Sequence, residues 1–262
     1  GVKSSLQTPE LNISNSPPAK GGQGGVNSSL QGGINGKTQV NVRPVLSGNV
    51  LTFHTENYDK SQTLVIDPPT RAWGTYYGGT LDDYGYSVAV AADGSVYLAG
   101  ETATTAAGVI ASGGHQNTHG GGGNDAFLVK FDAAGVRQWG TYYGGMGGEF
   151  GTSVAVASDG SVYLAGHTST TTAGVIASGG HQDTFGGGTT DAFLVKFNAA
   201  GVRQWGTYYG ETGSDWGRAV AVAAADGSVY LAGQTSTTTA GVIASGGHQD
   251  TFGGGTTDAF LV

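Results

Sequence analysis

A unit of 66 residues recurs through most of this chain and constrains its fold more than any other feature. The string Trp-Gly-Thr-Tyr-Tyr-Gly begins at Trp73, Trp139 and Trp205, so both intervals are 66 residues. Two further strings recur in the same order, Asp-Gly-Ser-Val-Tyr from Asp93, Asp159 and Asp226, and Asp-Ala-Phe-Leu-Val from Asp125, Asp191 and Asp258. Self-similarity at a fixed period indicates an array in which one supersecondary unit stacks on copies of itself.

Within one copy, the sequence predicts four antiparallel strands joined as a meander. Alternating apolar residues over 87–91 and 95–100 flank Asp93-Gly94, a dipeptide typical of β-hairpins. A loop rich in Thr, Ala and Gly follows, and then come strands over 125–132 and 136–143. A four-stranded sheet in every copy is the pattern of β-propeller blades. We therefore expect an all-β fold, an incomplete β-propeller of four-stranded antiparallel blades, preceded by a short β-rich segment.

Composition divides the chain into three regions. Residues 1–37 are rich in Ser, Asn, Gly, Gln and Pro, which predicts a flexible segment. Residues 38–70 are predicted to be the C-terminal part of an upstream β domain, with strands over 38–43, 49–53 and 64–66. Residues 71–262 hold the propeller repeats, predicted as a fourth strand 71–78, blades 86–143 and 152–209, and a partial blade 218–262.

Two irregularities qualify this division. The third copy has one more residue before Asp226 than the second has before Asp159, and we expect a longer turn or a bulge to absorb it. The chain begins abruptly at Gly1 and stops at Val262 inside a repeated string, which favours a fragment of a longer protein.

Composition also excludes several classes of function. The chain has 11 Lys and Arg residues and a net charge of −8, which disfavours a nucleic-acid partner or an anionic membrane surface. It has no Cys, so it can form neither disulfides nor thiolate metal sites. It contains no apolar run of about 20 residues, so no membrane span is expected.

The repeated strings together resemble a known family. Trp-Gly-Thr-Tyr-Tyr-Gly-Gly, the hairpin Ser-Val-Ala-Val to Asp-Gly-Ser-Val-Tyr-Leu-Ala-Gly, and Asp-Ala-Phe-Leu-Val-Lys-Phe resemble the bacterial seven-bladed β-propeller repeats, called SBBP repeats, over roughly residues 71–262. Residues 53–68 resemble the end of the β-rich domain that commonly precedes such repeats. Members are typically large secreted or cell-surface bacterial proteins without an established activity. The resemblance therefore implies a secreted or cell-surface location, although this sequence shows no signal peptide, and it brings no catalytic residues.

Candidate ligand-binding residues lie in the loops. The loops after the second and fourth strands of a blade are expected at one edge, and loops on a rigid scaffold commonly carry function. Carboxylates recur just before each first strand, at Asp83, Glu149 and Asp215. They could line one mouth of a ring and attract a cation or a polyhydroxyl ligand. The alternative is that they cap turns or keep an exposed mouth soluble.

Other recurring side chains are better explained by structure. A His-Gln pair recurs in the long loops at His115, His181 and His248, and these histidines are the other three candidate ligand-binding residues of the loop face. The interpretation we favour is that the pair anchors each loop, because adjacent blades hold such loops too far apart to share a metal. Asp125, Asp191 and Asp258 follow glycines and are predicted to close turns. Residues 120–127 match a calcium-binding nonapeptide once, but the next copy breaks the match at Thr189. The recurring Trp and Tyr residues are predicted to pack between sheets rather than to stack on sugars.

The sequence therefore predicts a non-enzymatic extracellular scaffold for adhesion or for binding a protein or a glycan through its long-loop face. No catalytic residue, metal or cofactor is expected. Two alternatives stay open. One is a structural spacer without a specific ligand. The other is a non-catalytic fragment of a carbohydrate-active enzyme whose catalytic residues lie in other blades.

Overall fold

The computed structural model describes residues 42–47, 50–55 and 72–262, and this part contains strands and no helix. It therefore has no helix that is long and apolar enough to cross a membrane. The chain divides into two compact units, Gly1–Pro69 and Thr70–Val262. In the first unit β1 (Val42–Ser47) pairs antiparallel with β2 (Val50–Thr55).

The predicted strands of the first unit are shifted or lie outside the description. The strand expected over 38–43 appears at Val42–Ser47, and the one expected over 49–53 appears at Val50–Thr55. Residues 1–37 and the strand predicted over 64–66 lie outside the described residues.

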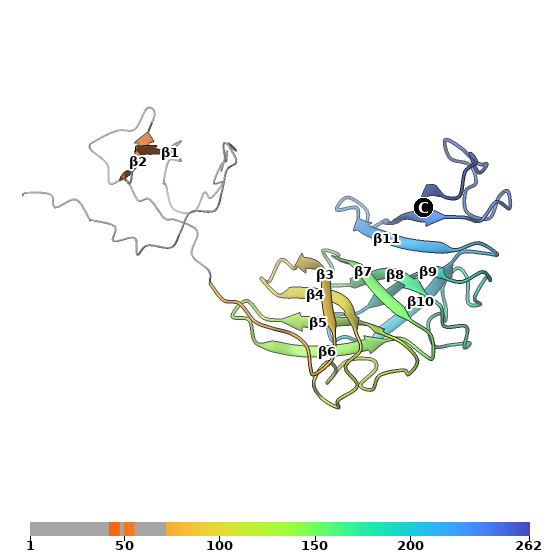
Figure 1. Cartoon of the computed structure of the whole chain (residues 1–262), viewed down its shortest axis with the longest axis horizontal. Helices are drawn as coiled ribbons and strands as arrows, with labels where there is room; N and C mark the ends of the chain where they lie inside the picture. Colours follow the sequence, from red (N-terminus) through yellow and green to blue (C-terminus); the bar gives the residue numbers. More distant parts are fainter. Residues whose placement is uncertain (1–41, 48–49, 56–71) are drawn as a thin grey trace, which may run out of the picture. The chain divides into compact units, whose positions relative to one another are not determined.

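The second unit consists of three antiparallel sheets in chain order (Figure 1). The first sheet contains β3 (Asp83–Val90), β4 (Val96–Thr102), β5 (Asp125–Phe131) and β6 (Arg137–Tyr143). The second contains β7 (Glu149–Val156), β8 (Val162–Thr168), β9 (Asp191–Phe197) and β10 (Arg203–Tyr209). The third contains β11 (Asp215–Val222), β12 (Val229–Thr235) and β13 (Asp258–Leu261). Each is a sequential meander, which confirms the predicted blade topology.

The sheets pack on one another with their first strands innermost. Strand β3 contacts β7, and β7 contacts β11. Between the first two sheets, Tyr97 and Leu128 pack with Val154, Leu164 and Phe193 in one buried cluster. The three described sheets do not close into a ring, so the fold is an all-β, incomplete β-propeller with four-stranded antiparallel blades.

The first strand of every blade begins three residues earlier than predicted. Asp83, expected in a loop, pairs with Thr102, and the strands of the other copies begin at Glu149 and Asp215. A bulge between Gly85 and Ser87 explains the difference, since it interrupts the alternation of apolar residues from which the strand was predicted.

The extra residue of the third copy is absorbed in the hairpin turn, as predicted. Ala223 donates its N–H to the Ser228 carbonyl at 2.8 Å, whereas Ala157 of the second copy donates to the nearer Ser161 at 2.8 Å. The ladders beyond the turns keep the same register, with Val222 opposite Val229 and Val156 opposite Val162.

The segment before the first blade differs from the prediction. Residues 72–78 pair with no described strand, although a fourth strand was expected over 71–78. Their side chains nevertheless pack like those of a fourth strand. The Trp73 indole N–H donates to the Ala133 carbonyl at 3.0 Å, and Trp139 on β6 donates to the Ala199 carbonyl at 3.0 Å. A sheet ladder needs a hydrogen-bonded neighbour, and none of the described strands supplies one.

Candidate functional site

Two kinds of loop meet at one edge of the blades, as the meander predicts. The long loop after β4 lies against the short loop after β6, because the Gly123 N–H donates to the Gly147 carbonyl at 3.1 Å. The Glu149 N–H donates to the Asn124 carbonyl at 2.7 Å, and the Asp215 N–H donates to the Thr190 carbonyl at 2.7 Å. This loop edge carries all six of the predicted site residues.

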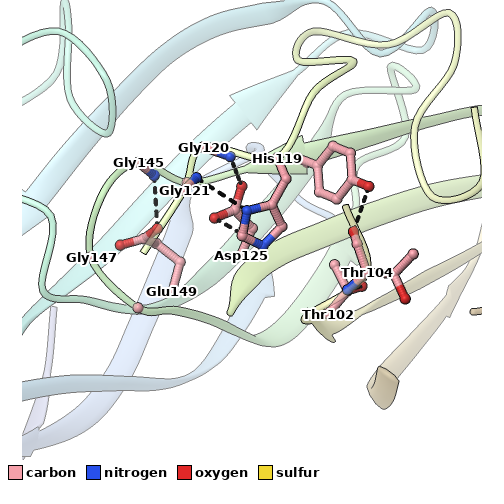
Figure 2. Close-up of polar contacts among 12 residues, drawn as sticks. Thr102, Thr104, His119, Gly120, Gly121, Asp125, Gly145, Gly147 and Glu149 are labelled. Atoms are coloured by element: carbon pink, nitrogen blue, oxygen red, sulfur yellow. Dashed lines mark hydrogen bonds and ion pairs between the residues drawn. The ribbon is translucent and has the colours of Figure 1, made fainter. Parts of the chain in front are cut away.

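The three recurring carboxylates accept hydrogen bonds from the turns that precede the first strand of each blade. The Glu149 carboxylate is fully buried and accepts hydrogen bonds from the Gly145 N–H at 2.8 Å and the Thr168 hydroxyl at 2.7 Å (Figure 2). Asp215, also fully buried, accepts from the Glu211 N–H at 3.0 Å. Asp83 accepts from the Gly79 N–H at 2.7 Å. This arrangement matches the turn-capping alternative.

A second carboxylate faces Glu149 and Asp215, one at each of the two blade junctions. Asp125 and Asp191 are fully buried and accept from the N–H groups of Gly120 and Gly186, each at 2.6 Å. This confirms their predicted role in closing turns. The Asp125 and Glu149 carboxylates crowd the same side of Gly144, where an added Cβ would lie 2.6 Å from Asp125 Oδ1 and 2.5 Å from Glu149 Oε2.

Burial governs the ionisation of these inner carboxyls. It raises the pKa of Asp125 to about 7, and the charge of Glu149 raises it as well, while the Gly120 N–H acts in the opposite direction. The pKa of Asp191 is raised to about 7 in the same way, with Asp215 as the neighbouring charge. Within the described part of the chain, the Oδ1 atoms of Asp125 and Asp191 are buried without a hydrogen-bond partner.

His119 approaches one of these carboxyls. Its Nε2 lies 3.7 Å from Asp125 Oδ1, and its Nδ1 accepts from the Gly121 N–H at 3.1 Å (Figure 2). The corresponding residue of the second copy is Phe185, so the second junction pairs its carboxyls without a histidine. The described residues contain no group of three or more His, Asp or Glu side chains that could hold a metal ion.

The recurring histidines do not hold the long loops by hydrogen bonds. His115, His181 and His248 are exposed, and the His115 ring lies 6.3 Å from that of Tyr143. The glutamine of the His-Gln pair forms the hydrogen bonds that were predicted to anchor the long loop. Gln116 donates from Nε2 to the Gly144 carbonyl at 3.1 Å and from its N–H to the Thr141 hydroxyl at 2.8 Å.

The repeated tryptophans pack between sheets, as predicted. Trp139 is 6% exposed, and its ring lies 5.9 Å from that of Tyr97. Its N–H is bonded to the Ala199 carbonyl on the neighbouring sheet. The Trp139 ring is therefore part of the core, while Trp73 and Trp205 are partly buried and each packs against a buried hydrophobic cluster.

A set of side chains on the innermost strands was not singled out from the sequence. Phe150 on β7 stacks on His167 of β8 with ring centroids 4.6 Å apart, and His167 stacks on Trp216 of β11 at 5.0 Å. The Arg218 guanidinium lies 4.5 Å from the Trp216 ring centroid. We call this set, with its equivalents in the other blades, the inner-strand ladder; it comprises Tyr84, Tyr86, Glu101, Phe150, Thr152, His167, Trp216, Arg218 and Gln234.

Comparison of the three copies would have found the ladder from the sequence. Over the stretch that all three share, only four positions carry three different residues. They are Asp82/Gly148/Ser214, Tyr84/Phe150/Trp216, Tyr86/Thr152/Arg218 and Glu101/His167/Gln234. Three of the four positions form the ladder, and Tyr84 lies directly opposite Glu101 in the sheet, as Phe150 lies opposite His167.

No protein-family model matches the chain. The chain is similar to the "Regulatory protein FlaEY" of Caulobacter vibrioides, with 31% identity over 157 residues. The match covers 60% of this chain and 16% of that protein, so the chain spans about a sixth of the length of this relative.

Proposed function

We propose that this chain is a non-enzymatic, secreted or cell-surface β-propeller scaffold of the SBBP repeat type that binds a protein or a glycan. The observation that carries the proposal is the distribution of side chains over near-identical blades. Copies two and three differ at one position between residues 159–195 and 226–262, yet at seven of nine positions between 145–153 and 211–219. A constant frame that carries one diverse segment in every blade is what a binding scaffold requires.

The buried carboxylates support a role without catalysis. The pairs Asp125/Glu149 and Asp191/Asp215 repeat one arrangement, in which each member is fully buried and accepts a hydrogen bond from the backbone of its own loop. These groups hold the loop edge in place.

The location is supported by the repeated motifs, since the repeats they resemble typically belong to secreted or surface proteins. The relative in Caulobacter vibrioides is named a regulatory protein, and the shared part is 16% of its length. A binding module within a longer protein would fit both observations.

Binding assays with the purified chain test the proposal. We expect saturable binding to at least one member of an array of bacterial polysaccharides or of an array of surface proteins, and no release of reducing ends from the polysaccharides. An absence of saturable binding on both arrays would favour a structural spacer. Release of reducing ends that is lost on single Asp or Glu substitutions would favour an enzyme.

A further inference from the structure

The three copies of the repeat differ in sequence at partly buried strand positions, where substitutions are least expected. Exposed loops usually tolerate substitution better than partly buried strand residues. In this chain the long loop over 168–190 is repeated without change over 235–257, although many of its residues are exposed. The ladder position on the second strand, by contrast, changes from Glu101 to His167 to Gln234. Packing alone does not explain this, because the core residues around the ladder are the same in all copies.

All residues of the ladder are aromatic or can form hydrogen bonds. One position is always aromatic, as Tyr84, Phe150 and Trp216, and its partner across the strands is always polar. The ring planes of His167 and Trp216 are inclined by only 10°, and those of Phe150 and His167 by 9°, so the rings stack from the second blade to the third.

The ladder contains buried polar atoms without partners. Glu101 is 4% exposed and His167 is 8% exposed. Glu101 Oε2 and His167 Nδ1 make no hydrogen bond with any described residue. Buried polar atoms are normally paired, so two unpaired atoms at one repeated position indicate groups that pair with something else. Burial, and secondarily the Arg218 charge, lower the pKa of His167 to about 4, so the imidazole is neutral at pH 7.

The ladder also has accessible parts. The side chains of Tyr84 and Tyr86 are about half exposed, at 48% and 50%, and Arg218 is exposed beside Trp216. The Tyr86 hydroxyl donates to Glu101 Oε1 at 2.6 Å, which leaves the other carboxylate oxygen unpaired. A ligand could thus reach the rings of Tyr84 and Tyr86 and the Arg218 guanidinium, which lie beside the buried groups of the ladder.

We propose that the inner-strand ladder is a binding site for a neutral oligosaccharide. This inference rests on the proposed function and assigns it a ligand class and a surface. Aromatic faces pack against the apolar C–H face of a pyranose ring, and the accessible polar groups, which are the Tyr84 hydroxyl, the Arg218 guanidinium and the Gln234 amide, pair with its hydroxyls. The side chains that differ between blades set which sugar each position accepts. A polyanion is disfavoured, because Arg218 is the single cation of the ladder and Glu101 lies in the same set.

The test uses the full chain on an array of neutral oligosaccharides (cello-, xylo-, manno- and malto-series) beside uronic acid oligosaccharides. We expect saturable binding to a neutral series. Trp216→Ala and Phe150→Ala should each weaken it about tenfold or more, as truncation of an aromatic anchor does. His181→Ala, on the constant long loop, should leave the affinity within twofold.

Matched variants take their residues from other copies and so keep the fold. Trp216→Phe introduces the residue of the second copy, and His167→Gln that of the third. We expect Trp216→Phe to bind within about threefold of the parent but to lose part of the ligand-induced change in tryptophan fluorescence. Glu101→Gln should reduce affinity about threefold to tenfold, since it removes the charged acceptor. Thermal unfolding of each variant shows whether it folds.

The outcomes separate the two proposals. Saturable glycan binding that persists within twofold in Trp216→Ala, Phe150→Ala and Glu101→Gln would overturn the ladder site and leave the scaffold function standing. Saturable binding to a protein without binding to any oligosaccharide would also overturn the ladder site and leave the scaffold function standing. Binding confined to the uronic acid oligosaccharides would do the same. An absence of saturable binding to either class would overturn both. If the alanine variants do not fold, the folded Glu101→Gln and Trp216→Phe variants decide.

Discussion

The two blade junctions are built from the same parts and differ in a few side chains. In the first junction the Tyr143 hydroxyl of β6 donates to the Ile176 carbonyl of the second blade, and in the second the Tyr209 hydroxyl donates to the Ile243 carbonyl at 2.6 Å. Each junction also buries a pair of carboxyls beside one glycine. The first junction pairs Asp125 with Glu149, whereas the second pairs Asp191 with Asp215 in the position of Glu149.

The change from Asp to Glu shows what the junction requires. Asp215 accepts from the Glu211 N–H and also from the Thr237 hydroxyl at 3.0 Å. Glu149 keeps the bond from the turn N–H and accepts from the Thr168 hydroxyl, as Asp215 does from the Thr235 hydroxyl. The bonds to the turn backbone and to the first threonine are therefore constant, whereas the bond from the second threonine is found at Asp215 alone of these two. Joining the turn to the neighbouring strand is the function that these acids share.

The largest expected difference between the junctions comes from the packed tryptophan. Trp139→Ala removes a ring that is 6% exposed and a hydrogen bond to Ala199, so it should lower the free energy of unfolding by about 3–5 kcal/mol. Trp205→Ala removes a less buried ring and should cost about half as much. Denaturant unfolding of the two variants measures this. Equal losses would show that the junctions do not differ in the way their packing indicates.

The carboxyl pairs should make both junctions sensitive to pH. The pKa of Asp125 and Asp191 rises from the ordinary 3.8 to about 7 on folding, so the folded chain holds more protons than the unfolded chain between these values. The stability from these groups is therefore present below about pH 4 and lost as pH rises through 7, by on the order of 4 kcal/mol per carboxyl. Denaturant unfolding at several pH values measures the slope.

Asn variants provide the control for the pH effect. Asp125→Asn keeps an acceptor for the Gly120 N–H but cannot lose a proton, so the slope between pH 4 and 7 should fall by about half. Asp191→Asn should halve the slope in the same way through the second junction. The double variant should remove most of the dependence of the unfolding free energy on pH. A slope that neither substitution changes would contradict the assignment to these groups.

Substitution of the glycine beside each carboxyl pair should lower the free energy of unfolding by a smaller amount. Gly144→Ala should cost about 1–3 kcal/mol, because the new methyl group meets the Asp125 and Glu149 oxygens. Gly210→Ala should cost somewhat less, since its Cβ would lie 2.7 Å from Asp215 and 2.8 Å from Asp191, slightly farther than in the first junction. Gly247→Ala is the control, as no atom lies within 4 Å of its Cβ. Comparable losses in all three variants would show that contact with the carboxyl pair is not the cause, since Gly→Ala without such a contact normally stabilises a fold.

The sequence predicted the parts that repeat better than the parts that differ. Strand order, the hairpins and the packing of Trp139 followed from periodicity, because the same string met the same environment in every copy. The start of the first strand was placed three residues late, since the bulge after Gly85 breaks the period of two on which strand predictions rest.

Side-chain partners were harder to predict. The loop contacts were expected from the His115-Gln116 pair, and Gln116 forms them. Two adjacent polar residues cannot be told apart without knowing which one faces the blade. The motifs were found as strings that are the same in every copy. The inner-strand ladder was missed because its residues differ from copy to copy.

The smallest expected effect concerns the histidine of the first junction. His119→Phe gives the first junction the residue that the second has at Phe185, where the ring packs edge-on against Tyr208 with centroids 5.9 Å apart. The variant loses the bond from the Gly121 N–H and gains apolar contact, so its stability should change by less than about 1 kcal/mol.

The pH profile of the same variant separates two explanations of the raised pKa of Asp125. Asp191 reaches about the same pKa, near 7, with Phe185 in place of a histidine, so burial rather than the imidazole controls both carboxyls. We therefore expect His119→Phe to leave the stability slope between pH 4 and 7 unchanged. The reverse substitution, Phe185→His, should leave it unchanged as well. A slope that moves in opposite directions in the two variants would show that the histidine sets the charge of its junction.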